Sequence, residues 1–503
     1  MRRRLFCQAT LAAALASPHL AGRALAGVYA GLMSIDADVE AIAPSGSEKL
    51  LSRAVVQELA DSLRGRLLLP GNAAYDTARL VLNPAIDKYP ALIVQPTGPA
   101  DVQSAVQFAA ANELIVAVKC GGHSFSGKST CNGGLLIDLS SYRNVQVDAG
   151  RQLAYVTGGS LLGAIDHETM ARGLVTTAGT VSHTGVGGLA TGGGFGRVGR
   201  RFGLALDNIR AVDVVSADGK FHHASDEENR ELFWAVRGGG GNFGVVTNFT
   251  FQLHPMQREV IGGMLHYPIE KARALLETYA EYSVELPDEL YLDCGVGYPP
   301  GGGPGFAVLS VCYSGPVAGY DRAMQPFARL GEPARNSVAA IDYVALQRSS
   351  DHSDPRAMVS YVKDGFVEGI TAALIDTILE GLEADPGRLT QCYFQHAGGA
   401  IGRVPADATA FVHRYASHDL MVILAWPPGS EAATHTDYIR RYWQKLAPHT
   451  RGFYSVVGED KSRAAEMNAN FEGNIQRLIA VKNRYDPTNM FRLNANIKPT
   501  VQT

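Results

Sequence analysis

The sequence predicts an α+β protein of more than one domain, with helices packed on sheets. Residues 91–120 read as a strand, a helix and a second strand, which together form a β–α–β unit. Glycine clusters are dense up to residue 255, and beyond it amphipathic helices alternate with strand segments in a more ordinary composition. The chain of 503 residues is 46% hydrophobic and 19% charged, which suits two or three domains with substantial cores.

The first 26 residues read as an export signal. Arginines at positions 2–4 precede a short Ala/Leu-rich run that closes on Ala24-Leu25-Ala26, a pattern suited to a signal peptidase. Arg3-Arg4-Leu5-Phe6 resembles a twin-arginine signal. We therefore expect export to the periplasm or the medium, with an ordinary secretory signal as the alternative route.

Residues 27–88 are expected to form a helical lead-in to the first domain. The stretch 50–65 places apolar residues at helical spacing and ends on Gly65, a plausible helix C-cap.

The first domain is then expected over residues 89–255. Its predicted strands and helices follow in order, with strands at 91–96, 113–120, 133–140, 145–159, 209–219 and 245–255, and helices at 100–112, 159–174 and 226–237. Pro96 and Pro255 each stop a strand.

A second α+β domain is expected over residues 256–465, and residues 466–503 form a separate C-terminal segment. The second domain has predicted helices at 271–286 and 371–385 and predicted strands at 306–313, 391–400 and 419–426. The C-terminal segment has a helix over 468–485 and an irregular tail rich in proline and asparagine.

Charge and cysteine usage exclude several classes of protein. The net charge is −4, and beyond the first four residues no Lys/Arg block offers a site for nucleic acid. After residue 26 no run approaches the roughly 18 apolar residues that span a bilayer. The six cysteines form no C-x-x-C pair, so we expect no metal site. Cys120 and Cys131 could form a disulfide after export, although free thiols are favoured.

Two strings match the G-x-G-x-x-G fingerprint of dinucleotide-binding folds, at 194–199 and 239–244. That fingerprint requires a buried strand before it and a helix after it. A polar, glycine-containing segment precedes the first match, and the second lies between a predicted helix and a predicted strand, the reverse order. We therefore exclude a nicotinamide-dependent dehydrogenase.

The many glycines still require an explanation. They are concentrated in residues 119–127, 185–196 and 238–244. Glycine-rich loops let backbone N–H groups approach a ligand closely and form cradles for phosphate oxygens. Three such loops indicate a long ligand that contains a pyrophosphate. Arg197, Arg200 and Arg201 are expected at the surface or beside a phosphate.

Four segments in this order resemble the berberine-bridge-enzyme-like group of FAD-linked oxidases, within the vanillyl-alcohol-oxidase (PCMH-type) flavoprotein superfamily. They are VAVKCGGHSFSGKSTCNGGLLIDLS, TTAGTVSHTGVGGLATGGGFGRVGRRFGLALDNI, ELFWAVRGGGGNFGVVTNFTF and RYDPTNMFRLNANIKP. The resemblance extends over about residues 70–500. It implies a discontinuous PCMH-type FAD-binding domain, made from the N-terminal half and the C-terminus, and a substrate domain whose antiparallel sheet covers the isoalloxazine ring.

The resemblance also implies which residues hold FAD. His123 takes the position where the family attaches FAD covalently through imidazole. The other implied FAD residues are Lys119, Gly121, Gly122, Ser124, Gly127, Gly179, Gly185, Gly187, Gly188, Gly193, Gly194, Gly196, Asn242, Gly244, Val245, Tyr485, Asn489, Asn494 and Asn496.

Two departures from the family pattern carry predictions. Many relatives have a second covalent bond from a cysteine where this chain has Val181, so we expect a single tether. Many relatives also have Y-x-N-Y-x-D near the end of the substrate domain. Here Tyr454 keeps the first tyrosine, while Val456 and Val457 replace the asparagine and the tyrosine that can act as base.

Valine cannot accept a proton, so another side chain must act as the base during hydride removal. The candidates are Tyr454, His183, Tyr393 and His396. His413 is a further candidate, but the His413-Arg414 pair resembles a structural pair of the family and is expected in the core.

The resemblance implies a small-molecule substrate that bears a hydroxyl, an amine or an activated C–H bond, and sugar, phenolic and alkaloid-like compounds all fit. Thr184 takes a position where oxidases of the family carry a small residue beside the flavin, which favours oxygen as acceptor and hydrogen peroxide as product. The alternatives are a dehydrogenase that uses a quinone or a protein acceptor, and a flavin-binding protein without turnover. A monomer and a homodimer are both open.

Overall fold

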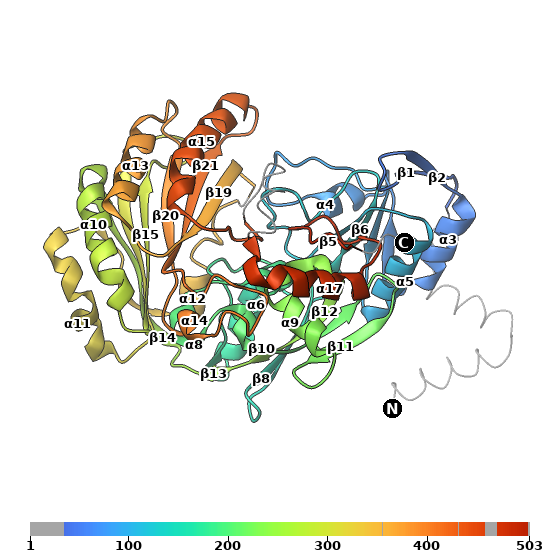
Figure 1. Cartoon of the computed structure of the whole chain (residues 1–503), viewed down its shortest axis with the longest axis horizontal. Helices are drawn as coiled ribbons and strands as arrows, with labels where there is room; N and C mark the ends of the chain where they lie inside the picture. The colour runs from blue at the N-terminus through green and yellow to red at the C-terminus, as the bar shows by residue number, and fades with distance from the viewer. Residues whose placement is uncertain (1–34, 355, 431, 458–469, 501–503) are drawn as a thin grey trace, which may run out of the picture.

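The computed structural model describes residues 35–354, 356–430, 432–457 and 470–500. The predicted export signal lies outside these residues. Two parts stand side by side, one built on a four-stranded and a five-stranded sheet and the other on a larger sheet (Figure 1). Mixed α and β structure with antiparallel sheets was the predicted fold class, and it is confirmed.

The four-stranded sheet has the order β3-β4-β6-β5, with β4–β6 and β6–β5 parallel. The predicted β–α–β unit is confirmed, with β6 inserted between its two strands. Apolar residues of α3 and α5, such as Val56 and Val102, pack on Leu92 and Ile137 of the sheet. The elements are α3 (Arg53–Ser62), β3 (Arg66–Leu68), α4 (Tyr75–Arg79), β4 (Leu92–Gln95), α5 (Pro99–Ala111), β5 (Val116–Lys119) and β6 (Leu135–Asp138).

The segment 27–88 corrects the expectation of a purely helical lead-in. It contains a hairpin, β1 (Val39–Ile42) and β2 (Glu48–Leu51), and strand β3, which extends the sheet. Strand Arg66–Leu68 has only three residues and is too short to show a period, so its pairing with β4 could not be read from spacing.

The five-stranded sheet is antiparallel, with the order β11-β10-β12-β8-β7. Its elements are β7 (Val145–Asp148), β8 (Leu153–Thr157), α6 (Leu162–Met170), α7 (Val186–Gly192), α8 (Gly199–Phe202), β10 (Ile209–Val215), β11 (Phe221–Ser225), α9 (Arg230–Gly239) and β12 (Val245–Gln252). A small pair, β9 (Leu174–Val175) and β13 (His254–Pro255), lies beside it.

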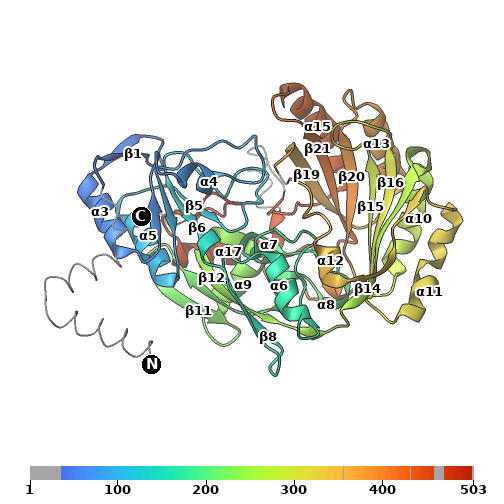
Figure 2. The same cartoon turned by 180° about the vertical axis from the view of Figure 1, so that it is seen from behind.

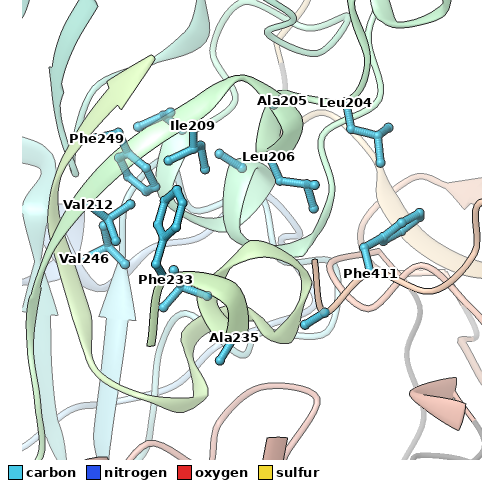
Figure 3. Close-up of a cluster of buried hydrophobic side chains, with 14 of the residues drawn as sticks. Leu204, Ala205, Leu206, Ile209, Val212, Phe233, Ala235, Val246, Phe249 and Phe411 are labelled. Carbon is cyan, nitrogen blue, oxygen red and sulfur yellow. The ribbon is translucent and has the colours of Figure 1, made fainter. Parts of the chain in front are cut away.

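The core of this part joins helix α9, the sheet and more distant loops. Phe233 of α9 lies against Val212 and Phe249, and Leu206 and Phe411 belong to the same cluster (Figure 3). Phe411 belongs to the loop between β20 (Thr390–His396) and β21 (His418–Trp426) in the second part. The two parts therefore share buried apolar surface.

The second part is built on an eight-stranded antiparallel sheet. Its path runs β17-β14-β16-β15-β20-β21-β19, and β18 pairs with β14. Its remaining elements are β14 (Glu259–Pro268), α10 (Ala272–Tyr282), β15 (Leu290–Gly297), β16 (Phe306–Tyr313), α11 (Tyr320–Met324), β17 (Arg335–Asn336), β18 (Ala339–Asp342), α12 (Tyr343–Gln347), β19 (Val359–Val367), α13 (Ala372–Glu383), α14 (Ala400–Arg403) and α15 (Ala432–Leu446).

Helices α10, α13 and α15 cover the outer face of this sheet (Figures 1 and 2). Phe394 of β20 and Leu420 of β21 point to these helices and join their core. Because side chains alternate along a strand, Tyr393 and Gln395 of β20 and Met421 of β21 point to the other face, toward the first part of the molecule. The sheet therefore presents selected side chains to the junction.

Helix α17 (Ile475–Tyr485) and the following tail return to the first part (Figure 1). Met490 and Phe491 join the core of α3, α5 and the four-stranded sheet. Lys482 and Asp486 form a fully buried ion pair with a 2.6 Å separation. The lysine also donates to the carbonyls of Asn242 and Phe491, so the tail is fixed to the loop after α9.

None of the helices in the described ranges combines the length and apolar character needed to cross a bilayer. All five cysteines in these ranges are free, including Cys120 and Cys131.

Candidate active site

A cavity of about 480 Å³ lies at the junction of the two parts. Loops from the first part, the C-terminal tail and side chains of β20 and β21 all contribute to its wall. Segments far apart in sequence therefore meet at one site.

Two glycine loops touch at the wall of this cavity. A Cβ built on Gly121 would lie 2.3 Å from the backbone nitrogen of Gly185, and one built on Gly185 would lie 2.2 Å from that of Gly121. Backbone atoms cannot yield at such distances, so both positions require glycine.

Other lining glycines keep an open face toward the cavity. A Cβ on Gly188, Gly240 or Gly241 would meet nothing within 4 Å, so ligand atoms can approach these backbones closely. The buried Oδ1 of Asn494, also in the wall, has no hydrogen-bond partner among the described residues. Open backbone cradles and an unpaired amide oxygen fit the FAD that the sequence implies.

The structure brings many of the predicted cofactor residues into the wall. Eleven of them line the cavity: Gly121, Gly122, His123, Ser124, Gly179, Gly185, Gly187, Gly188, Gly244, Val245 and Asn494.

Several other predicted cofactor residues lie behind the wall, which corrects the expectation of direct contact. Lys119 pairs with Asp138 at 3.3 Å, and burial lowers the pKa of its ammonium. Asn242 ties down the tail by donating to the Ala495 carbonyl and accepting from the backbone nitrogen of Ile497. The Tyr485 hydroxyl bonds Asn229. The others outside the lining are Gly127, Gly193, Gly194, Gly196, Asn489 and Asn496.

Close packing explains why glycine occupies several of these positions outside the lining. A Cβ on Gly127 would lie 2.5 Å from the Ile86 side chain, and one on Gly196 would lie 2.8 Å from the backbone of Gly179. These glycines permit close packing of the loops, whereas Gly188, Gly240 and Gly241 in the wall have open space at the Cβ position.

His123 and His183 form a hydrogen-bonded pair. Nε2 of His123 lies 2.7 Å from Nδ1 of His183, and Nδ1 of His123 lies 3.3 Å from the Thr184 hydroxyl. Burial, followed by the neighbouring His183, lowers the pKa of His123 to about 4. His123 is therefore neutral near pH 7. His183 supports His123 from behind and is absent from the lining.

The sheet contributes Tyr393, Gln395 and Met421 to the opposite wall. The Tyr393 hydroxyl donates to Oδ2 of Asp293 on β15 at 2.8 Å. Tyr291 donates to the same oxygen at 2.8 Å, and the His396 backbone nitrogen donates to Oδ1 at 2.9 Å. Burial nevertheless raises the pKa of Asp293 to about 6.

His396 is not an active-site base, which corrects the sequence-based candidate. Its side chain points to the helical side of the sheet, opposite to Tyr393 and Gln395. Nε2 lies 2.9 Å from the Ser283 carbonyl oxygen, and Nδ1 accepts from the Leu292 nitrogen. Burial lowers the pKa of His396 well below its ordinary value.

Tyr454 lines the cavity but is held tightly in place. Its hydroxyl accepts from the Gly194 nitrogen at 2.7 Å, and its own backbone nitrogen bonds Asp364. Burial raises the pKa of its phenol well above the ordinary value. Val456 and Val457 lie beside it in the wall, so the position of the missing tyrosine is part of the site.

Two groups of charged residues prove structural. Arg197 and Arg200 are buried and donate to the carbonyls of Thr180 and Ala397, respectively. Neither therefore lies at the surface, which was one of the two positions expected for them. Arg414 makes a buried bidentate pair with Asp207, and the imidazole of His413 stacks on Phe366, in agreement with the expected core role.

Several residues in the wall or directly behind it carried no recognised signal in the sequence. Asp293 lies in a strand whose eight residues are all buried, so no alternation marks its face. Gly240 and Gly241 belonged to a recognised glycine loop, yet only their open faces single them out as ligand-facing. Further examples in the wall include Cys120, Lys128, Gly158, Gln395, Met421, Leu493 and Ala495.

Comparison with known proteins agrees with this site. Residues 90–225 match the FAD binding domain family, and residues 467–498 match the family described as berberine and berberine like. An FAD-linked oxidoreductase of Dictyostelium discoideum is 33% identical over 458 residues, which cover 90% of this chain and 99% of that protein. The (R)-6-hydroxynicotine oxidase of Paenarthrobacter nicotinovorans is 29% identical, with 87% of this chain and 97% of that protein covered.

Solved structures agree as well. The wild-type BBE-like 1 protein of Physcomitrella patens superposes with a TM-score of 0.80 at 25% identity, covering 89% of this chain and all of that one. The fold, the cavity and these similarities lead to one assignment. The chain belongs to the berberine-bridge-enzyme-like family and is an FAD-linked oxidoreductase with a PCMH-type FAD-binding domain.

Proposed function

We propose that this enzyme is an oxidase that carries FAD on His123 and removes hydride from a small hydroxyl-bearing molecule. The observation that supports this most is the single cavity in which His123 and its glycine loops face the tyrosine-bearing sheet. FAD supplies the isoalloxazine ring, which accepts a hydride and passes two electrons to the acceptor.

The chain holds FAD from three sides in this proposal. Backbone at Gly188, Gly240 and Gly241 approaches the cofactor, and the unpaired Oδ1 of Asn494 accepts a hydrogen bond from it. The family match over residues 467–498 supports the participation of the tail.

A covalent bond to His123 is supported by the state of its side chain. The low pKa, about 4, keeps the imidazole neutral, so one ring nitrogen retains a lone pair that can form the bond. Val181 lines the cavity where many relatives carry the second tether, and valine cannot form one. We expect one covalent bond.

The substrate end of the cavity favours phenolic or alkaloid-like compounds over sugars. Tyr393, Met421, Tyr454 and Val457 offer aromatic and aliphatic surface there. A relative named for (R)-6-hydroxynicotine supports the same class. Gln395 has a buried Oε1 without a partner among the described residues, so it can accept a hydrogen bond from the substrate.

Molecular oxygen is the proposed acceptor, with hydrogen peroxide as product. Thr184 is small and lies in the wall beside His123, which leaves room for oxygen near the tether. Stopped-flow reoxidation separates the acceptors, because an oxidase reoxidises rapidly in oxygen. A reduced enzyme that reoxidises slowly in oxygen but rapidly with a quinone would be a dehydrogenase.

Export through the N-terminal signal is proposed on the sequence alone, and the signal lies outside the described residues. Fractionation of cells that express the full chain tests it. The mature protein should be found in the periplasm or the medium, and Arg3→Lys with Arg4→Lys should hold it back if the route is the twin-arginine one.

The central experiment is an anaerobic screen for bleaching of the flavin. Phenols, hydroxylated N-heterocycles, sugars and hydroxy acids are mixed with the holoenzyme, and the visible flavin absorbance is followed. We expect bleaching by a phenolic or N-heterocyclic compound. Bleaching by sugars alone would overturn the substrate class while leaving the reaction type intact.

A further inference from the structure

The wall of the cavity holds an acid–base pair that takes the place of the missing tyrosine at Val457. We propose that Asp293 receives the substrate hydroxyl proton through the phenol of Tyr393, which makes Tyr393 the catalytic base and Asp293 its positioning residue. The inference rests on the proposed oxidation of a hydroxyl-bearing substrate.

The hydrogen bond between Tyr393 and Asp293 provides a path for a proton from the cavity to the buried carboxylate. The Tyr393 ring lines the cavity, while its hydroxyl donates to Oδ2 of Asp293 at 2.8 Å. A phenol that donates its proton to a carboxylate still has lone pairs to accept a proton from a substrate hydroxyl. Asp293 itself is buried behind the wall, so it can act only through this phenol.

Two neighbours on β15 and β20 hold the carboxylate in position. Tyr291 donates to Oδ2, the oxygen that Tyr393 also uses, and the His396 backbone nitrogen donates to Oδ1. Three hydrogen bonds stabilise the charged form and burial opposes it, with a resulting pKa of about 6. The carboxylate is therefore the main form at neutral pH and can still take up a proton.

Other titratable and charged groups around Asp293 do not provide a competing acceptor. The Arg197 guanidinium favours the carboxylate, and the surrounding phenols and thiols have raised pKa values because they are buried. The groups that face Asp293 are Arg197, Tyr279, Tyr291, Cys294, Cys312, Tyr393 and His396.

The remaining candidate bases are less suited to this role. Tyr454 receives the Gly194 N–H on its hydroxyl, and among the described residues no carboxylate is hydrogen-bonded to that hydroxyl. His183 is bonded to His123 and stands behind the tether. Tyr393 is the candidate that joins a cavity-lining hydroxyl to a buried carboxylate.

The proton and electron balance is complete. For a substrate with a CH–OH group, that carbon would lose its C–H bonding pair as hydride to the bound FAD, and its C–O bond would become a carbonyl. The hydroxyl proton moves to the Tyr393 oxygen as the phenol proton moves to Oδ2 of Asp293. Tyr393 ends unchanged and Asp293 ends as a neutral acid, which returns its proton through the same phenol to water once product leaves.

The test compares Asp293→Asn, Tyr393→Phe and the matched control Tyr291→Phe in the holoenzyme. Tyr291 bonds the same carboxylate oxygen but is fully buried and lies outside the lining. Anaerobic flavin reduction is measured against pH with a substrate from the screen. Wild type should show kcat/KM falling below about pH 6, because the acceptor is the carboxylate.

Asp293→Asn and Tyr393→Phe should each slow reduction by ~10²–10⁴-fold, the usual contribution of a general base. Asp293→Asn should also lose the acid limb of the profile. Tyr291→Phe should remain active but shift that limb to higher pH, because the carboxylate loses one stabilising hydrogen bond. A wild-type rate and pH limb in Asp293→Asn would overturn the proposal.

A second readout does not depend on turnover. Infrared difference spectra with ¹³C-labelled aspartate should show a protonated carboxyl that titrates near pH 6, disappears in Asp293→Asn and shifts upward in both tyrosine variants. If no compound bleaches the wild-type flavin, the proposed function fails. The infrared titration still tests whether Asp293 and Tyr393 form the proposed pair. An aspartate band unmoved by Tyr393→Phe would show that no such pair exists.

Discussion

At the scale of single residues, His123 shows how burial prepares a side chain for chemistry. A histidine in water would be partly protonated near neutral pH, whereas burial here holds its pKa at about 4. In the neutral tautomer that carries its proton on Nε2 toward His183, Nδ1, which contacts the Thr184 hydroxyl at 3.3 Å, keeps the lone pair needed for the proposed covalent bond.

The first prediction concerns His123→Ala. The variant should fold and bind FAD through the glycine loops, but the flavin should separate from the protein on acid denaturation, because no ring nitrogen remains to hold it. The measurement is the colour of the acid precipitate against that of the supernatant. A yellow precipitate from the variant would place the tether elsewhere.

The second prediction concerns His183→Ala. The 2.7 Å contact holds the His123 ring in its orientation, so its loss should lower the covalently bound fraction of FAD several-fold. Absorbance of the acid precipitate per mole of protein measures this fraction. Ser182→Ala is the matched control, because Ser182 bonds Asp351 instead; equal losses in both variants would indicate a general loop effect.

At the scale of elements, helix α17 and its tail behave as a clamp on the cavity wall. The buried ammonium of Lys482 bonds the Asp486 carboxylate and two backbone carbonyls. The same carboxylate accepts from the nitrogens of Met490 and Phe491, which turn the chain toward Asn494.

The third prediction follows from that clamp. Asp486→Asn removes the negative partner of a fully buried lysine and should destabilise the protein by about 3–5 kcal/mol. The exposed pair of Arg477, on the same helix, and Glu231, on α9, provides a control, and Glu231→Gln should cost less than about 1 kcal/mol. Chemical denaturation of both variants measures the difference, and equal losses would contradict the clamp.

Helices and strands were predictable from the sequence where the spacing of apolar residues and the residues that bound each element were clear. Helices α5, α9 and α13 and strands β20 and β21 lie within or close to their predicted ranges. The face that a strand turns to the site was harder. Alternation along 391–396 already separates Tyr393 and Gln395 from His396, but only the packing of α10 shows which set is covered.

The candidate site was predictable in part. Glycine density located the three loops, yet it could not separate Gly188, which faces open space, from Gly196, which packs against Gly179. Asp293 was beyond sequence reasoning, because its partner Tyr393 is about a hundred residues away and its own strand is buried throughout.

At the scale of the whole molecule, the two parts are joined on both sides of the cavity. The Asn83 amide donates to the carbonyls of Phe125 in the first part and Ser360 in the second, each at 2.8 Å. The buried pair of Arg414 and Asp207 and the insertion of Phe411 into the α9 core add further links. We expect the parts to unfold together.

The fourth prediction tests whether the two parts unfold in one cooperative transition. The His123→Ala protein should gain about 2.7 kcal/mol of stability when free FAD reaches a hundred times its dissociation constant, because only the folded state binds the cofactor. Calorimetry should show one transition that moves upward with FAD. Two transitions, of which only one responds to FAD, would mean that the parts unfold independently.

The order of the wall segments along the chain has a consequence for biosynthesis. His123 leaves the ribosome early, whereas Leu493, Asn494 and Ala495 of the same wall are synthesised roughly 20–75 s later at ~5–20 residues per second. The nascent chain therefore lacks a complete flavin pocket for most of its translation. The pocket is complete only after residue 495 has been synthesised, and a premature stop codon anywhere before residue 486 would yield a chain without the closing wall.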